Sequence, residues 1–139
     1  MLISADAPAL TGPNVREIVD AGVRDPHREL PVAQLVEHRV DLPEPLFGEG
    51  ITVVGDRIWQ LTWQDGVAIE RNRHTLEEVR RVTYEGEGWG LCRDGGRLVM
   101  SDGSDELAFR DPTSFAETGS VAVRRDGQPV TRLNELECV

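Results

Sequence analysis

The sequence is poor in basic residues, in aromatic residues and in long hydrophobic runs, and these shortages exclude several classes of protein. Fifteen basic residues, all of them arginines, stand against 25 aspartates and glutamates among 139 residues, so the formal net charge is −10. A negative net charge opposes nonspecific binding to nucleic acid and to an anionic membrane surface. No stretch reaches the roughly 18 to 20 apolar residues that a membrane-spanning helix needs. We therefore expect neither nucleic acid nor a membrane as a partner.

Cysteine and histidine are also scarce. Two cysteines, Cys92 and Cys138, are too few for the disulfide framework of a small secreted domain, and neither has the neighbours of a zinc site. We interpret both as small buried residues. The three histidines show no ligand spacing among the arginines around them, namely His27, His38 and His74. The sequence therefore predicts no metal and no cofactor.

No export signal is visible at the start of the chain, because residues 1–6 contain neither a basic region nor an apolar core. The sequence as it stands thus favours a cytoplasmic protein. Hydrophobic residues make up 39% and charged residues 29% of the chain, which is typical of one folded domain.

An internal repeat organises most of the chain. Residues 48–59, GEGITVVGDRIW, are followed by a similar run at 86–99, GEGWGLCRDGGRLV. The match continues downstream at an offset of about 38 to 40 residues, where Thr75-Leu76 corresponds to Ser114-Phe115. A third copy opens at residues 133–139 and predicts the beginning of a strand there.

Each copy consists of short apolar or alternating runs between Gly, Asp, Asn and Pro, a pattern that predicts strands. The first copy predicts strands at 50–54, 57–63, 66–71 and 78–84, and the second at 89–93, 97–101, 106–110 and 117–123. Gly55-Asp56 and Gly95-Gly96 are expected to form the first hairpin turn of each copy. Four strands repeating at about 40 residues are typical of a β-propeller blade.

The predicted fold is therefore all-β and propeller-like. We expect one blade at 47–85, a second at 86–132, the start of another at 133–139, and a divergent partial blade at 1–46. Since propellers have roughly four to eight blades, these cannot close a ring, and the chain is expected to be a fragment. Its open blade edges could support self-association.

The repeat also predicts where polar chemistry gathers. Glu49 and Trp63 lie on either side of the first hairpin turn, and antiparallel pairing is expected to bring them opposite each other. Trp89 and Asn134 begin the innermost strands of the next two blades, so both should reach the same end. An acid, an amide and two indoles would form a small pocket for a polar group between aromatic walls.

Simpler interpretations stay open for these residues. Glu49 has a counterpart in Glu87, so the Gly-Glu-Gly element could be a turn with a surface carboxylate. Trp63 corresponds to Gly103 in the second copy and is therefore not required by the repeat, although it could be an ordinary core or rim residue. Trp59 is expected in the core. Asp102, with Ser101 and Ser104, is interpreted as turn chemistry.

Five motifs occur in order along the chain: Phe47–Thr52, Gln60–Trp63, Tyr84–Leu91, Ser101–Ser104 and Leu133–Glu137. In these motifs the sequence closely resembles the plant and bacterial type of glutaminyl cyclase, the glutaminyl-peptide cyclotransferases. The resemblance implies a five-bladed β-propeller and an acyltransferase that works without zinc. It also implies a reaction, the conversion of an N-terminal glutamine to pyroglutamate with release of ammonia. Peptides or proteins with N-terminal glutamine would be the partners.

The resemblance further implies roles for the four site residues. Glu49 becomes the catalytic carboxylate, general base and then acid, while Trp63 and Trp89 become walls of the substrate pocket and Asn134 a polar contact. The Phe-Thr-Gln-Gly-type motif of the family is not found in residues 1–46, and a later tryptophan and lysine would lie beyond Val139. Two alternatives therefore stay open, a non-catalytic module that binds peptides or proteins and an inactive truncated remnant. Family members are often exported, so the compartment is left unassigned.

Overall fold

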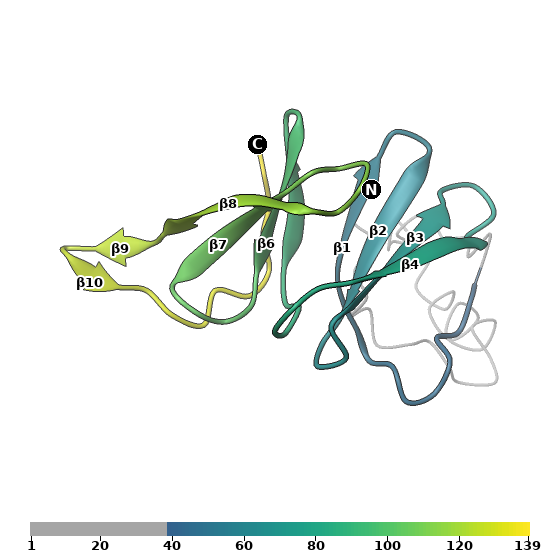
Figure 1. Ribbon diagram of the computed structural model, residues 1–139, viewed down its shortest axis with the longest axis horizontal. Coiled ribbons are helices and arrows are strands. Elements are labelled where there is room, and N and C mark those ends of the chain that lie inside the picture. Colours follow the sequence, from purple (N-terminus) through teal and green to yellow (C-terminus); the bar gives the residue numbers. More distant parts are fainter. Residues whose placement is uncertain (1–38) are drawn as a thin grey trace, which may run out of the picture. The chain divides into compact units, whose positions relative to one another are not determined.

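The computed structural model describes residues 39–139, which contain three antiparallel sheets (Figure 1). The first sheet has the order β1 (Gly48–Val54), β2 (Arg57–Thr62), β3 (Val67–Asn72) and β4 (Glu78–Thr83). The second has the order β5 (Leu91–Asp94), β6 (Arg97–Ser101), β7 (Glu106–Arg110) and β8 (Glu117–Ala122). Strands β9 (Arg124–Arg125) and β10 (Gln128–Pro129) form a small hairpin. In this part of the chain no helix is long and apolar enough to cross a membrane.

The eight strands predicted from the repeat are confirmed, each within two residues at either end. The two predicted hairpin turns are confirmed as well, and Gly55 and Gly95 adopt the left-handed φ values of 58° and 56° that favour glycine. The β9–β10 hairpin was not expected. The boundaries proposed for the blades stay predictions, and most of the expected partial blade at 1–46 lies outside the described residues.

The strand predicted to begin at 133–139 is wrong, because this segment has no regular strand pairing within the described residues. A strand needs a neighbouring strand to satisfy its backbone groups, and none of the described strands pairs along this segment. Individual bonds hold it instead. The N–H of Arg132 donates to the carbonyl oxygen of Gly103 at 2.7 Å, and the hydroxyl of Ser101 donates to the carbonyl oxygen of Asn134 at 2.8 Å.

A disulfide between Cys92 and Cys138 also holds this segment, with the Cα atoms 5.6 Å apart. The interpretation of both cysteines as separate small buried residues is therefore wrong, although Cys92 is indeed buried. The two residues are 46 positions apart in the sequence. Only the fold, which brings the terminal segment to β5, shows that they pair.

The connection between the third and fourth strands is built the same way in both sheets. The side-chain oxygen of Asn72 accepts two backbone N–H groups in the first loop, and that of Asp111 accepts two in the second. The donors are His74 and Thr75 in one loop, and Thr113 and Ser114 in the other. Short polar side chains that bond the backbone two or three residues ahead are typical turn formers.

A buried arginine completes each of these loops. Arg71 donates to the carbonyl oxygen of Leu76 at 3.1 Å, and Arg110 donates to that of Phe115 at 3.3 Å. Both acceptor residues have left-handed backbones, with φ of 59° at Leu76 and 65° at Phe115. The predicted correspondence of Thr75-Leu76 with Ser114-Phe115 is thus confirmed in three dimensions.

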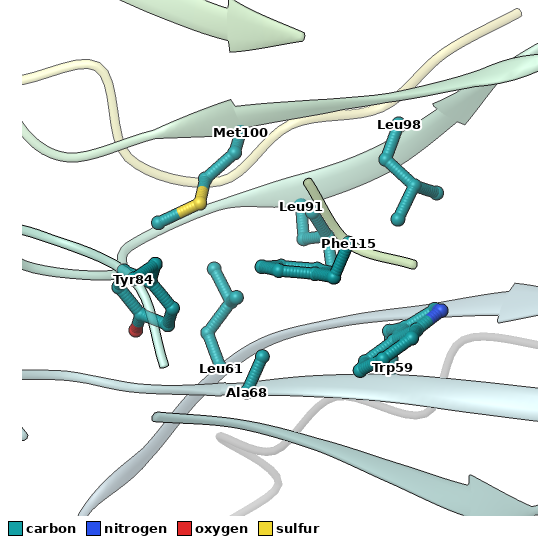
Figure 2. Close-up of a cluster of buried hydrophobic side chains, with 8 residues drawn as sticks. All are labelled: Trp59, Leu61, Ala68, Tyr84, Leu91, Leu98, Met100 and Phe115. Carbon is teal, nitrogen blue, oxygen red and sulfur yellow. The ribbon is translucent and has the colours of Figure 1, made fainter. Parts of the chain in front are cut away.

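Phe115 links the two sheets. Its ring is 2% exposed and lies 4.7 Å from the ring of Trp59 and 6.0 Å from that of Tyr84, between centroids. Figure 2 shows it among buried side chains of both sheets, which are Trp59, Leu61, Ala68, Tyr84, Leu91, Leu98 and Met100. The indole N–H of Trp59 donates to the carbonyl oxygen of Pro112 at 2.9 Å. Trp59 is therefore a core residue, as predicted, and the loop after β7 packs against the first sheet.

Candidate functional site

Two tryptophans share one carboxylate where the sheets meet. The indole N–H of Trp63, just after β2, donates to Oε2 of Glu87 at 2.9 Å. The indole N–H of Trp89, just before β5, donates to the same oxygen at 2.8 Å. The amide of Gln64 donates to the other oxygen, Oε1, at 3.3 Å. The structure thus brings both predicted tryptophans together, around an acid to which the sequence analysis gave no role.

The hydrogen bonds to Glu87 affect its titration. They lower the pKa of this carboxyl below the usual range, with the bond from Trp89 as the largest cause. Partial burial and the nearby negative charge of Asp102 act in the opposite direction. Glu87 therefore remains a carboxylate at neutral pH and carries a fixed negative charge between the two indoles.

Each indole also rests on a neighbour. The ring of Trp63 meets that of Phe47 edge-on, with centroids 6.0 Å apart, and remains 39% exposed. The ring of Trp89 lies against Gly103, where a Cβ atom would come within 2.7 Å of the indole. Gly103 also has a left-handed backbone, with φ of 85°. The residue that replaces Trp63 in the repeat is thus the platform for Trp89.

Glu49 lies close to this group along the backbone, in an irregular part of β1. The N–H of the next residue, Gly50, donates to the carbonyl oxygen of Trp89 at 2.8 Å. Gly50 has no room for a side chain, since a Cβ atom would lie 2.7 Å from that same oxygen. Glu49 is partly buried, one residue from this contact between β1 and the start of β5.

The predicted pairing of Glu49 with Trp63 is wrong. Register shifts between Gly48 and Ile51, so that Gly48 pairs with Thr62, and the N–H of Trp63 donates to Phe47 at 2.9 Å. There are two reasons. The turn at Gly55-Asp56 pairs Val54 with Arg57, a register that would place Glu49 opposite Thr62, and a β-bulge, in which one strand contributes an extra residue, moves the pairing by one more. Glu49 lies inside this bulge. Bulges often occur beside functional sites, where they redirect a side chain.

Asn134 reaches the same end through its backbone. The hydroxyl of Ser101 accepts the N–H of Gly90 at 2.9 Å and donates to the carbonyl oxygen of Asn134 at 2.8 Å. This hydroxyl therefore links the residue after Trp89 to the terminal segment. The Asn134 residue itself is exposed. Ser101 is 1% exposed and buried at the end of β6, so its interpretation as turn chemistry is wrong.

The interpretation of Asp102 and Ser104 as turn-forming residues is confirmed. Oδ1 of Asp102 accepts the N–H of Ser104 at 2.9 Å, and the hydroxyl of Ser104 accepts the N–H of Glu106 at 3.1 Å.

Among residues 39–139 no group of His, Cys, Asp and Glu has the arrangement of a metal site. His74 lies 3.5 Å from a carboxylate oxygen of Asp56, whereas His27 and His38 fall outside the described residues.

Asp102 also lines a separate hollow. Most of the other residues that line it are polar or charged: Glu85, Met100, Glu106, Ala108, Arg110, Glu117 and Ser120. None of the predicted site residues lines it. It lacks the paired indoles, so the tryptophan group remains the better candidate for binding a substrate.

Glu87 was not predicted as a site residue, because in the sequence it stands out only as the repeat partner of Glu49. A usable signal was present in the spacing Glu87-Gly88-Trp89, since residues two apart on an extended chain share one side. The hydrogen bond from Trp63 to Glu87 joins residues 24 positions apart and could not be predicted from such a spacing. It depends on how β2 ends beside the start of β5.

Comparison with known proteins agrees with this architecture. A family model described as glutamine cyclotransferase matches residues 20–139. A protein from Arabidopsis thaliana named glutaminyl-peptide cyclotransferase is 36% identical over 94 residues, covering 67% of this chain and 29% of that protein. The crystal structure of Myxococcus xanthus glutaminyl cyclase superposes with a TM-score of 0.65 at 45% identity, covering 68% of this chain and 40% of that one. The chain thus spans less than half the length of either relative, and its fold is of the β-propeller type.

Proposed function

Because the chain belongs to the glutamine cyclotransferase family, we propose that its aromatic group forms part of a site that cyclises N-terminal glutamine. The observation that supports this most directly is the meeting of Trp63 and Trp89 on one carboxylate, beside the β1 bulge that contains Glu49. Such a group offers aromatic surface and negative charge to an incoming ammonium. Cation–π contact with a tryptophan stabilises a bound cation by roughly 1 to 2 kcal/mol.

The reaction joins two parts of one residue. The α-nitrogen of the glutamine forms a bond to the γ-carbon of its own side chain, and the bond from that carbon to the amide nitrogen breaks. The products are a five-membered pyroglutamyl ring and ammonia. Since both reacting groups belong to one molecule, folding the side chain into a reactive geometry is a large part of catalysis, with effective molarities of about 10⁵ M or more.

In this proposal Glu49 moves the proton. An α-amine has a pKa of about 8, so much of it is protonated at neutral pH and cannot attack the amide. Glu49 accepts one proton from the α-ammonium and delivers it to the departing amide nitrogen, while the second proton that the α-nitrogen loses as the ring closes leaves with the ammonia as ammonium. The same carboxyl group therefore serves as base and as acid, and no proton has to come from outside the site.

Asn134 is proposed to stabilise the charge that develops on the γ-carbonyl oxygen. Its side-chain amide carries two N–H donors. The bond from Ser101 to the Asn134 backbone supports this role, since it fixes the segment beside Gly90. A donor aimed at a developing oxyanion contributes about 3 kcal/mol in other enzymes.

The test measures ammonia release and binding of a glutamine-initiated dipeptide with the purified chain, with Glu49→Gln as the variant. We expect the variant to bind the dipeptide within threefold of the wild type and to release ammonia roughly 100-fold more slowly, as expected for loss of a general base. A chelator in the wild-type reaction should change nothing, which would support chemistry without a metal.

Two results would overturn parts of the proposal. Near-normal ammonia release by Glu49→Gln would remove Glu49 from the proton transfer. Tight binding of the dipeptide by the wild type without any ammonia release would make the chain a peptide-binding module and not an enzyme. A dipeptide that begins with asparagine is the matched control, because its shorter side chain cannot form the five-membered ring.

A further inference from the structure

The side chain of Glu87 makes more hydrogen bonds in this group than that of either tryptophan. Three donors converge on its two oxygens: both indole N–H groups on Oε2, at 2.9 and 2.8 Å, and the amide of Gln64 on Oε1. An indole has one N–H and no other polar atom. With both N–H groups directed to Glu87, ring carbon surfaces are the parts of Trp63 and Trp89 left to contact a ligand.

The backbone around Glu87 is fixed by its two glycines. Gly86 has a left-handed backbone, with φ of 86°, and nothing occupies the space where its side chain would be. Gly88 donates its N–H to the carbonyl oxygen of Trp63 at 2.9 Å, and a Cβ atom there would come within 3.0 Å of Leu61. This close approach brings Glu87 to the end of β2, between the two indoles.

Bonds of this kind orient the rings. A hydrogen bond to a charged acceptor is roughly twice as strong as one between neutral groups. Two such bonds to one oxygen restrict the rotation of both indoles and hold them at a defined separation. The negative charge beside the rings also increases their attraction for a cation.

We propose that Glu87 is a positioning residue, which holds Trp63 and Trp89 as the two walls that receive the substrate's ammonium group. The inference rests on the proposed function for the identity of the ligand. It assigns Glu87 no proton transfer, which remains with Glu49. Glu87 acts through the indoles, so its loss should weaken binding of the substrate more than it slows the chemical step.

The first test needs no substrate. In a spectrum of the ¹⁵N-labelled chain, the indole N–H signals report the partner of each tryptophan. Glu87→Ala should move the signals of Trp63 and Trp89 together and leave that of Trp59, which donates to Pro112, in place. Glu85→Ala, a change at an exposed residue two positions away, is the matched control and should move neither signal.

The second test separates positioning from chemistry. Glu87→Ala should raise the Kd for the glutamine-initiated dipeptide about tenfold, the equivalent of one lost cation–π contact. Where the chain releases ammonia, KM should rise by the same factor while kcat changes less than threefold. Glu87→Gln, which keeps an acceptor oxygen for the indoles, should restore part of the binding and guards against misfolding of the alanine variant.

Different outcomes would contradict the positioning role of Glu87 and the proposed cyclisation of glutamine. Unchanged Trp63 and Trp89 signals in Glu87→Ala, or unchanged dipeptide binding, would overturn the positioning role whether or not the chain is an enzyme. A fall in kcat without a change in KM would also overturn it, since that result would place Glu87 in the chemical step. Failure of the Glu49→Gln test would leave the indole signals unaffected and would count against the proposed function alone.

Discussion

The two Gly-Glu-Gly elements of the chain have the same three residues and different structures. The first, at residues 48–50, lies within β1 and contains the bulge. The second, at 86–88, precedes β5, begins with a left-handed glycine and directs its carboxylate to two indoles. The loops after β3 and β7, in contrast, repeat their hydrogen bonds almost atom for atom.

This contrast distinguishes the loops, which belong to the structural scaffold, from the Gly-Glu-Gly elements, which lie at the candidate site. The loops keep the same structure because their bonds are local, from one side chain to the backbone a few residues ahead. The Gly-Glu-Gly elements diverge because they lie at different distances from the hairpin turn that follows each of them, and because their surroundings include distant parts of the chain. We infer that the repeat preserves the packing of the sheets, while non-equivalent residues at one end supply binding.

The largest effect is expected where the second loop packs between the sheets. Phe115→Ala should lower the free energy of unfolding by about 3 to 5 kcal/mol, because it removes a buried ring from the contact with Trp59 and Tyr84. Leu76→Ala, at the equivalent position, should cost only about 1 to 2 kcal/mol, since Leu76 is partly exposed. Urea unfolding of both variants measures the difference. Equal losses would show that the two loops contribute alike to stability.

The disulfide is the next largest difference between the two copies, since Cys92 corresponds to Thr52 in the first. Reduction should lower the free energy of unfolding by about 2 to 4 kcal/mol, as expected when a loop of this size is opened. The terminal segment that includes Asn134 should then exchange its amide hydrogens faster. Thermal unfolding with and without a reducing agent measures the loss. The double variant Cys92→Ser/Cys138→Ser, which should not respond to the reducing agent, is the control.

The platform under Trp89 can be tested with two glycines. Gly103→Ala should cost about 1 to 2 kcal/mol from its left-handed backbone, and should also move the indole N–H signal of Trp89, because the new methyl group meets the ring. Gly95→Ala imposes a similar backbone cost at φ of 56°, with open space around its Cβ position. It should leave the Trp89 signal unchanged. A shift of equal size in both variants would argue against contact between Gly103 and the indole.

The smallest effect concerns pH and separates the two loops again. Hydrogen bonds from the backbone and hydroxyl of Ser114 lower the pKa of Asp111 below its ordinary value of 3.8. Since the folded pKa is below the unfolded one, the stabilisation is present above the unfolded value and is lost as the pH falls through the folded one. Asp111→Asn, which copies Asn72 of the first loop, should weaken the dependence of Tm on pH below 4. An unchanged slope would show that Asp111 does not contribute to acid sensitivity.

Much of the architecture could be predicted because the signals for strands and hairpin turns are local. Alternation of apolar residues predicted the ends of the eight strands to within two residues, and Gly55 and Gly95 predicted the positions of the turns. Trp59 was predictable as a core residue from its place on an alternating strand. The β-bulge at Glu49 was not, because an extra residue in one strand leaves no mark in the composition of the run.

Four features could be predicted from the order of the amino acids: the repeat, the all-β fold, the family and the gathering of Trp63 and Trp89 at one end. These follow from periodicities of two and about 40 residues and from motifs that are contiguous in the chain. Three features were visible only in the folded chain: Cys92 pairs with Cys138, Ser101 links Gly90 to Asn134, and Glu87 accepts hydrogen bonds from both indoles. The disulfide, the bond from Ser101 to Asn134 and the bond from Trp63 to Glu87 each join residues 24 or more positions apart, and nothing in the local sequence indicates which distant residues become neighbours.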